Sequence, residues 1–190
     1  MRSLLRVGAA LLVAAIIAVP LAAQEAAKKQ EAPKPAPGPA QDAAEQWNDV
    51  GRKLIAMAED FPEDKYDYKP TPEVRTFAEQ LLHIAGVNMI YTATAKGEKP
   101  GEENLPRAQY KTKGDVVSVL KKSFADATAI MKQKGDKGMM EKIKNPYGNE
   151  MTTLYSLAMG FNEHSGEHYG QLVVYYRING IVPPESRPKK

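Results

Sequence analysis

Two of the chain's three histidines lie four residues apart in the stretch NEHSGEHYGQL, which runs from Asn162 to Leu172. If this stretch is helical, His164 and His168 are only ~40° apart around the helix axis, and both imidazoles lie on one face. The third histidine, His83, has apolar neighbours in the stretch LLHIAGV. Three imidazole nitrogens with one open coordination position are a common site for a divalent metal ion. Imidazole suits zinc, nickel, iron or copper, and water or substrate would take the open position.

A histidine on an apolar helix face also has a simpler interpretation, as a hydrogen-bonded core residue. For His83 taken alone, we prefer that interpretation. However, all three histidines have apolar neighbours within expected helices, and none lies in an expected loop. His164 and His168 share their helix face with Leu157, Phe161, Leu172 and Tyr175, which directs both imidazoles toward the interior. We therefore predict one metal site made by His83, His164 and His168.

The letters HSGEH also match the HxxEH order of the inverted zinc peptidases, in which the glutamate activates water at the metal. Those enzymes need a third, acidic ligand well downstream. Here the stretch after His168 is short and ends in PPESRPKK, which leaves little room for such a ligand. In a helix, Glu167 also points ~100° away from His168. We therefore consider a solvent-facing or supporting role for Glu167 alongside the role of a base.

Four helical segments can position these histidines, according to hydrophobic periodicity and helix-end signals. They are expected at about residues 42–60, 76–96, 114–133 and 152–179. Thr76 and Glu79 form a capping-box pattern at the start of the second segment, and Gly97 follows its end. Gly135 is expected to close the third segment and Gly180 the fourth. Since strand signals are weak throughout, the sequence predicts an all-α fold, a four-helix bundle.

The first residues, MRSLLRVGAALLVAAIIAVPLAAQ, have the layout of a secretory signal peptide. Arg2 and Arg6 precede a short apolar run, which is followed by a proline and small residues. We expect residues 1–23 to be a signal peptide cleaved near Ala23, rather than a lasting membrane anchor. The protein is then exported to the periplasm or the extracellular space, without stable membrane insertion after cleavage.

The remaining chain divides into three parts. Residues 24–41 have alternating prolines, which favour extended backbone, and we expect them to form a disordered linker. Residues 42–184 are expected to form the bundle, and residues 185–190 a tail. With 190 residues and 43% hydrophobic content, the chain suits one globular domain with a sizeable core.

Charge and cysteine content exclude several classes of function. Loss of Arg2 and Arg6 with the signal peptide lowers the formal net charge from +3 to +1, which does not suit a nucleic-acid-binding protein. The sequence has no cysteine. Disulfides, thiolate metal sites, CxxC redox chemistry and a cysteine nucleophile are therefore excluded.

The sequence resembles the DinB-like (damage-inducible) family of four-helix bundles over about residues 42–184. The similarity is carried by FPEDKYDYKPTPEVRTFAEQLLHIAGVN, residues 61–88, and by NEHSGEHYGQLVVYYRINGIVPP, residues 162–184. The resemblance implies a divalent metal, often zinc or nickel, bound by three histidines that map onto His83, His164 and His168. Some relatives are transferases or isomerases that use low-molecular-weight thiols such as bacillithiol or mycothiol.

The family is usually cytoplasmic, whereas this chain begins with an export signal, which separates it from the cytosolic thiol pool. We expect an exported metal-dependent enzyme of the hydrolase or transferase type, with zinc or nickel as cofactor. The alternative is a non-catalytic protein that binds a metal or a small ligand. Expected partners are a small-molecule substrate or ligand and no nucleic acid, and a homodimer is left open.

Overall fold

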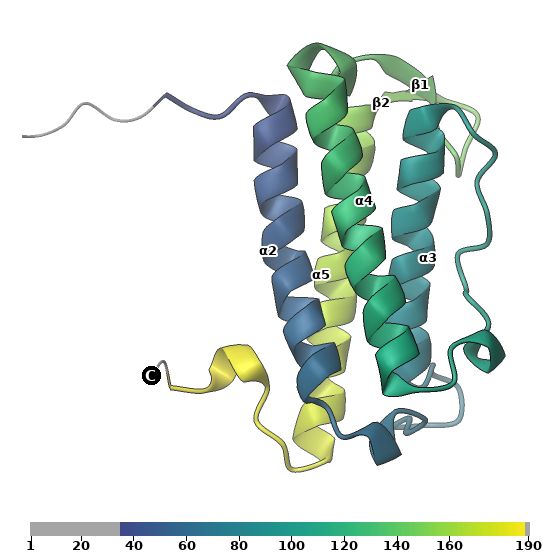
Figure 1. Cartoon of the computed structure of the whole chain (residues 1–190), viewed down its shortest axis with the longest axis vertical. Helices are drawn as coiled ribbons and strands as arrows, with labels where there is room; N and C mark the ends of the chain where they lie inside the picture. Colours follow the sequence, from purple (N-terminus) through teal and green to yellow (C-terminus); the bar gives the residue numbers. More distant parts are fainter. Residues whose placement is uncertain (1–34, 189–190) are drawn as a thin grey trace, which may run out of the picture. The chain divides into compact units, whose positions relative to one another are not determined.

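The structure is a computed structural model that describes residues 35–188. Four long helices make up most of it (Figure 1): α2 (Pro39–Asp60), α3 (Phe77–Lys96), α4 (Lys113–Met139) and α5 (Leu154–Ile178). The smaller elements are the strands β1 (Lys142–Lys144) and β2 (Met151–Thr153) and the 3-10 turns η1 (Glu63–Lys65), η2 (Arg107–Gln109) and η3 (Pro184–Ser186). The predicted all-α four-helix bundle is confirmed. The predicted signal peptide and most of the predicted linker lie outside the described residues.

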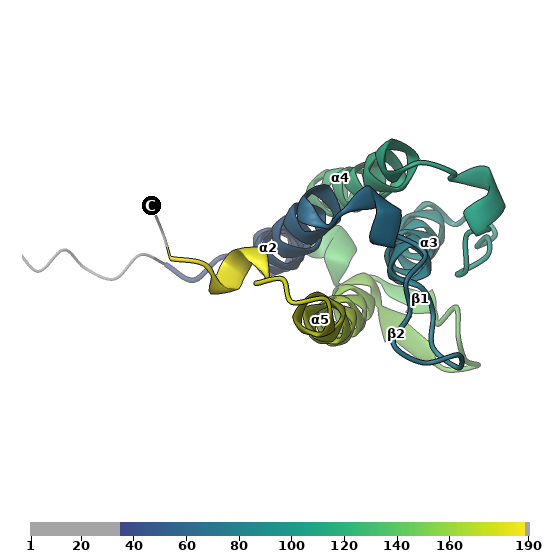
Figure 2. The same cartoon turned by 90° about the horizontal axis from the view of Figure 1, so that it is seen from below.

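The four helices form a ring in which α4 and α5 each pack against both α2 and α3 (Figure 2). Figure 1 shows that α3 and α4 run in the same direction, so the chain must return along the bundle between them. Residues 97–112 make this return, and we call them the crossover loop. Because this loop runs beside α3, it brings polar side chains to the helix that carries His83. No helix within residues 35–188 combines the length and the apolar character needed to cross a membrane.

The start and end of α3 follow the local sequence signals. The backbone N–H of Glu79 donates to the Thr76 hydroxyl at 3.2 Å, and the Thr76 N–H donates to the Glu79 carboxylate at 2.8 Å, which is the predicted capping box. Gly97 ends the helix with φ of 74°, a conformation that suits glycine. Helix α3 is buried on nearly every side because α4, α5 and the crossover loop surround it. It therefore holds His83 on a rigid element.

Apolar side chains fill the centre of the bundle. The largest fully buried ones include Trp47, Phe61, Tyr66, Phe77, Tyr91 and Tyr176. Their burial provides most of the driving force for packing, at roughly 25 cal/mol per Å² of apolar surface. The bundle thus has a large apolar core in addition to the histidine cluster.

Three details of the structure were not anticipated from the sequence. Helix α2 begins at Pro39, inside the predicted linker, because proline is tolerated in a first turn and Asp136 accepts a hydrogen bond from the Ala40 N–H at 3.0 Å. The strands β1 and β2 form an antiparallel hairpin that periodicity missed, since each strand has only three residues. The predicted tail is attached to α2, because Arg187 donates to both Asp60 carboxylate oxygens, at 2.8 and 2.5 Å.

Candidate metal centre

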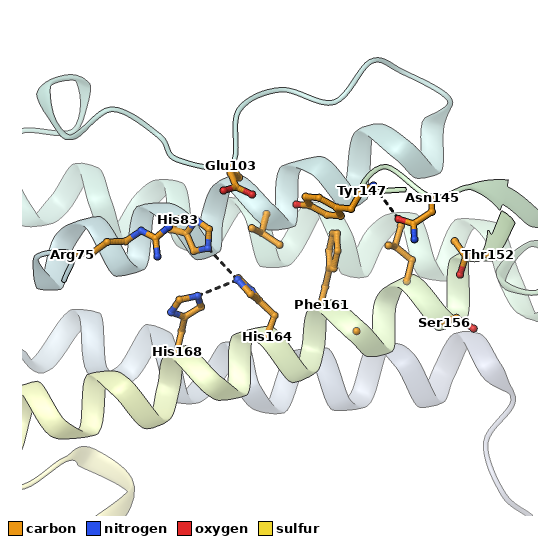
Figure 3. A pocket seen from close by; sticks show the side chains of 13 residues that line it. Arg75, His83, Glu103, Asn145, Tyr147, Thr152, Ser156, Phe161, His164 and His168 are labelled. Carbon is orange, nitrogen blue, oxygen red and sulfur yellow. Dashed lines mark hydrogen bonds between the residues drawn. The ribbon is translucent and has the colours of Figure 1, made fainter. Parts of the chain in front are cut away.

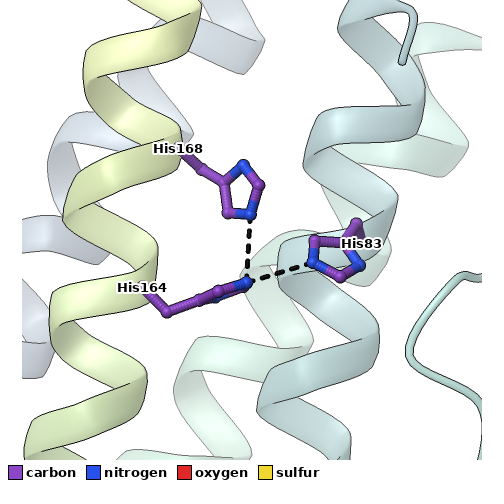
Figure 4. A group of neighbouring side chains, drawn as sticks. All are labelled: His83, His164 and His168. Atoms are coloured by element: carbon purple, nitrogen blue, oxygen red, sulfur yellow. Dashed lines mark hydrogen bonds between the residues drawn. The ribbon is translucent and has the colours of Figure 1, made fainter. Parts of the chain in front are cut away.

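The structure brings all three predicted histidines together between α3 and α5 (Figure 4). Nε2 of His164 lies 3.0 Å from Nε2 of His83 and 3.0 Å from Nε2 of His168. Both His83 and His168 are 6% exposed, and His164 is half-buried. No other group of three or more histidines and carboxylates in residues 35–188 is spaced to hold a metal ion.

The outer nitrogens of two histidines are held by amide oxygens. Nδ1 of His83 lies 3.0 Å from Oδ1 of Asn104, and Nδ1 of His168 lies 3.1 Å from Oε1 of Gln171. An amide oxygen only accepts hydrogen bonds, so each Nδ1 must carry the proton. In the neutral imidazoles, the Nε2 lone pairs of His83 and His168 therefore point toward the centre of the cluster.

The orientation of both amides is supported by further donors. Arg75 donates from Nη2 to Oδ1 of Asn104 at 3.0 Å, and the Gln80 amide donates to Oε1 of Gln171 at 3.0 Å. His164 can place at most one hydrogen on Nε2, so it cannot donate to both neighbouring lone pairs. The cluster therefore faces its own centre with more lone pairs than hydrogens. A cation bound by all three Nε2 atoms fits this donor set.

Burial keeps the three imidazoles neutral at physiological pH. It is the main cause that lowers the pKa of His83 and of His164, and the positive charge of Arg75 lowers both further. Burial, with the neighbouring His164 and His83, lowers the pKa of His168 to about 4. Neutral imidazole is the form that binds a metal ion, so no proton has to be displaced near pH 7.

A cavity of about 680 Å³ extends from the histidines along α5 toward the β hairpin (Figure 3). Its lining residues are Arg75, His83, Val87, Glu103, Asn145, Tyr147, Thr152, Ser156, Leu157, Gly160, Phe161, His164 and His168. The histidines lie at one end, apolar side chains form the middle, and polar side chains lie at the hairpin end. An ion on the three Nε2 atoms would therefore face a space large enough for a small molecule.

Glu167 is exposed and does not line this cavity. A water-activating base would have to reach the same space as the ion, and Glu167 is not among the residues that line that space. The geometry thus gives no support to the peptidase interpretation of HSGEH. Glu167 instead has the solvent-facing position that the sequence analysis gave as the alternative to a base.

Several supporting residues were missed by the sequence analysis: Gln80, Arg75 and, in the crossover loop, Glu103 and Asn104. Gln171, less than one turn after His168 on α5, also supports the site. It bonds Gln80 across to α3 and also holds His168. The need of His83 for an acceptor at Nδ1 was a usable signal, but nothing in the sequence identified Asn104 as that acceptor.

Comparison with known proteins agrees with this architecture. The family model described as the DinB superfamily matches residues 46–172. A DinB-like protein from Bacillus subtilis is 21% identical, with a TM-score of 0.62, over 78% of this chain and 99% of its own. A DinB-like protein from Bacillus cereus is 15% identical, with a TM-score of 0.64, over 76% of this chain and 95% of its own.

YfiT from Bacillus subtilis, described as a probable metal-dependent hydrolase with an unusual four-helix bundle topology, is 16% identical with a TM-score of 0.60. That match covers 80% of this chain and 94% of YfiT. No curated protein has a significant sequence match to the chain. The family match covers more than half of the sequence, and the four-helix bundle agrees with the similar structures: the chain belongs to the DinB superfamily.

Proposed function

We propose that this protein is an exported metal-dependent enzyme, of the hydrolase or transferase type, that acts on a small molecule. The observation that carries the proposal is the cavity at whose end the three Nε2 atoms of His83, His164 and His168 converge. The description of YfiT as a metal-dependent hydrolase supports it by analogy of fold. The N-terminal residues 1–23 support export, because of their signal-peptide pattern.

A divalent ion on these three nitrogens would supply Lewis acidity toward a substrate oxygen or toward water. The chain's own residues prepare the site for it. Asn104 and Gln171 hold the protons of His83 and His168 on Nδ1, which leaves Nε2 available as a ligand. The apolar side chains Val87, Leu157 and Phe161 in the cavity wall offer a surface for the apolar part of a substrate.

Zinc and nickel are the proposed ions, because both suit a ligand set of three imidazoles and the resemblance to the DinB-like family implies one of them. This choice is tested first by metal analysis of protein produced from residue 24 onward without a histidine tag. We expect about one zinc or nickel per chain. His83→Ala, His164→Ala and His168→Ala should each lose it while keeping their helix content, because the apolar core does not depend on the ion. Glu167→Ala is the matched control and should keep the metal.

Catalysis is tested by a screen of the metal-loaded protein against ester, amide and electrophilic substrates. Activity in the protein and in Glu167→Ala, absent from the three histidine variants, is the expected result. A protein that holds the ion with full occupancy and converts no substrate would favour the alternative, a non-catalytic protein that binds a metal or a small ligand. Absence of any bound ion after reconstitution with zinc and nickel would contradict the proposal.

A further inference from the structure

The cavity carries a positively charged side chain beside the histidines. Arg75 lines it next to His83 (Figure 3). Its guanidinium makes one hydrogen bond within residues 35–188, from Nη2 to Asn104, and no described carboxylate lies within ion-pair distance of it. A guanidinium has five N–H donors, so several remain available to a ligand.

The backbone of Arg75 is fixed between the two helices that supply the histidines. Its carbonyl accepts a hydrogen bond from the Tyr175 hydroxyl of α5, and the next residue, Thr76, caps α3. The backbone of Arg75 is therefore anchored beside the cluster, and the hydrogen bond from Nη2 to Asn104 directs its side chain there. This is the arrangement expected of a binding group rather than of a freely moving surface arginine.

The charge at this end of the cavity favours an anion. Three neutral imidazoles do not reduce the charge of a divalent ion, and Arg75 adds a further positive charge. Glu103 is the one acidic residue among those that line the cavity. A monoanion such as a carboxylate matches the guanidinium fork, whereas a phosphate dianion would suffer more repulsion from Glu103.

The rest of the cavity suits an apolar group. Val87, Leu157 and Phe161 line its middle, and the ring of Tyr147 lies 5.8 Å from that of Phe161 in an edge-on arrangement. Gly160 also lines this part, and a Cβ built there would meet no atom within 4 Å. The lack of a side chain at Gly160 leaves space above α5 one turn before His164.

We propose that the substrate of this site is a small carboxylate with an apolar body. Arg75 binds the carboxylate beside the metal ion, and the apolar body lies along Gly160 toward Phe161 and Tyr147. This inference rests on the proposed function for the presence of an ion, but the recognition itself depends on residues of the chain. It therefore can be measured by binding, without turnover.

The test compares 3-phenylpropionate with its neutral analogue 3-phenylpropanamide by isothermal titration calorimetry, on the zinc-loaded and on the zinc-free protein. We expect the carboxylate to bind about tenfold more tightly or better, as for a charge-assisted hydrogen-bond pair. Arg75→Gln should bring the ratio close to one in the zinc-free protein and lower it in the zinc-loaded protein, where the ion still attracts the carboxylate. Arg75→Lys should restore part of the loss in both. Arg177→Gln makes the same change at an exposed position of α5 and should leave the ratio unchanged.

The apolar part is tested with Gly160→Leu, which should weaken both ligands at least tenfold while zinc content is kept. Gly170→Leu is its control, because Gly170 also has open space but does not line the cavity. Equal affinity for the two ligands, no binding of either, or an unchanged preference in Arg75→Gln would overturn the proposal. Tighter binding of 2-phenylethyl phosphate would overturn the choice of carboxylate.

The two proposals fail in different ways. A protein that binds zinc but shows no Arg75-dependent preference contradicts the substrate class alone. A protein that binds no zinc, but whose zinc-free form still prefers the carboxylate through Arg75, contradicts the metal-dependent enzyme alone. In the zinc-free protein we expect the carboxylate to be preferred over the amide by a smaller factor than with zinc. Arg75→Gln should remove that preference.

Discussion

Oδ1 of Asn104 lies 3.0 Å from Nδ1 of His83, and this contact ties the crossover loop to the histidine cluster. The loop can come so close because Gly86, one turn along α3 from His83, has no side chain. A Cβ at Gly86 would overlap the backbone carbonyl of Glu103, the residue before Asn104. The orientation of a metal ligand is therefore coupled to the packing of a loop that is otherwise polar and largely exposed.

Replacement of Asn104 by alanine should weaken zinc binding by about 10- to 100-fold, the usual cost of losing a residue that orients a ligand. His83 would lose the acceptor that keeps its proton on Nδ1. Competition with a chromophoric chelator measures the affinity, and circular dichroism should show unchanged helix content. Asn104→Asp is the control, because it keeps an acceptor oxygen and should bind zinc nearly as well as the unchanged protein. Equal affinity in Asn104→Ala would contradict this role.

Two glycines provide a matched test of the loop contact. Gly86→Ala should destabilise the protein by roughly 1–3 kcal/mol, the range for overpacking, because the new methyl group pushes against the backbone of Glu103. Gly160→Ala makes the same change in α5 where space is open, and should stabilise by up to ~1 kcal/mol. Urea unfolding of the two variants measures the difference. Equal stabilities would show that the crossover loop yields without cost.

The main features of the fold could be predicted because they depend on local signals. The capping box at Thr76, the stop at Gly97 and the helical spacing of His164 and His168 all involve residues within a few positions of each other. The pairing of His83 with the other two needed only the expectation that apolar faces pack together. These features make up the bundle and the three central side chains.

The supporting residues could not be predicted because they depend on tertiary packing. Asn104 reaches His83 only because α3 and α4 are parallel and the chain must return beside α3. A simple antiparallel order would have placed this loop at the end of the bundle. Arg75, in the segment before α3, comes near the histidines through the hydrogen bond between its carbonyl and Tyr175 of α5, a residue distant in the sequence.

The stability of the metal-free protein should fall between about pH 6.5 and pH 4. The folded protein disfavours protonation of His168, whose pKa is lowered to about 4 mainly by burial, and also of His83 and His164. The unfolded chain binds protons at about pH 6.5, so acid favours unfolding across this window, and the stabilisation is fully present above it. Urea unfolding of chelator-treated protein at several pH values measures the effect.

A control separates the histidines from the carboxylates in that experiment. Arg187 holds the pKa of Asp60 below its usual value of 3.8, so the stabilisation from Asp60 is lost only at lower pH. His168→Gln should therefore reduce the change in unfolding free energy between pH 7 and pH 4.5, whereas Asp60→Asn should leave that change almost the same. A flat stability profile over this range in the metal-free protein would contradict the prediction.

Export and chemistry can be tested together, because the proposed location limits the available reagents. We expect N-terminal sequencing of the protein from its own cells to find processing near Ala23, as the pattern of residues 1–23 predicts. A protein outside the cytosol lacks the cytosolic thiol pool, whereas an ion bound by the three histidines remains with the chain. The metal-loaded protein should therefore convert its substrate without added thiol, and addition of a low-molecular-weight thiol should change the rate by less than about twofold, since no step requires it.

Activity that appears only with a thiol would refute this prediction. An unprocessed N-terminus in protein recovered from the cytosol would refute export, and a thiol-dependent transferase would then be the better form of the metal-dependent enzyme.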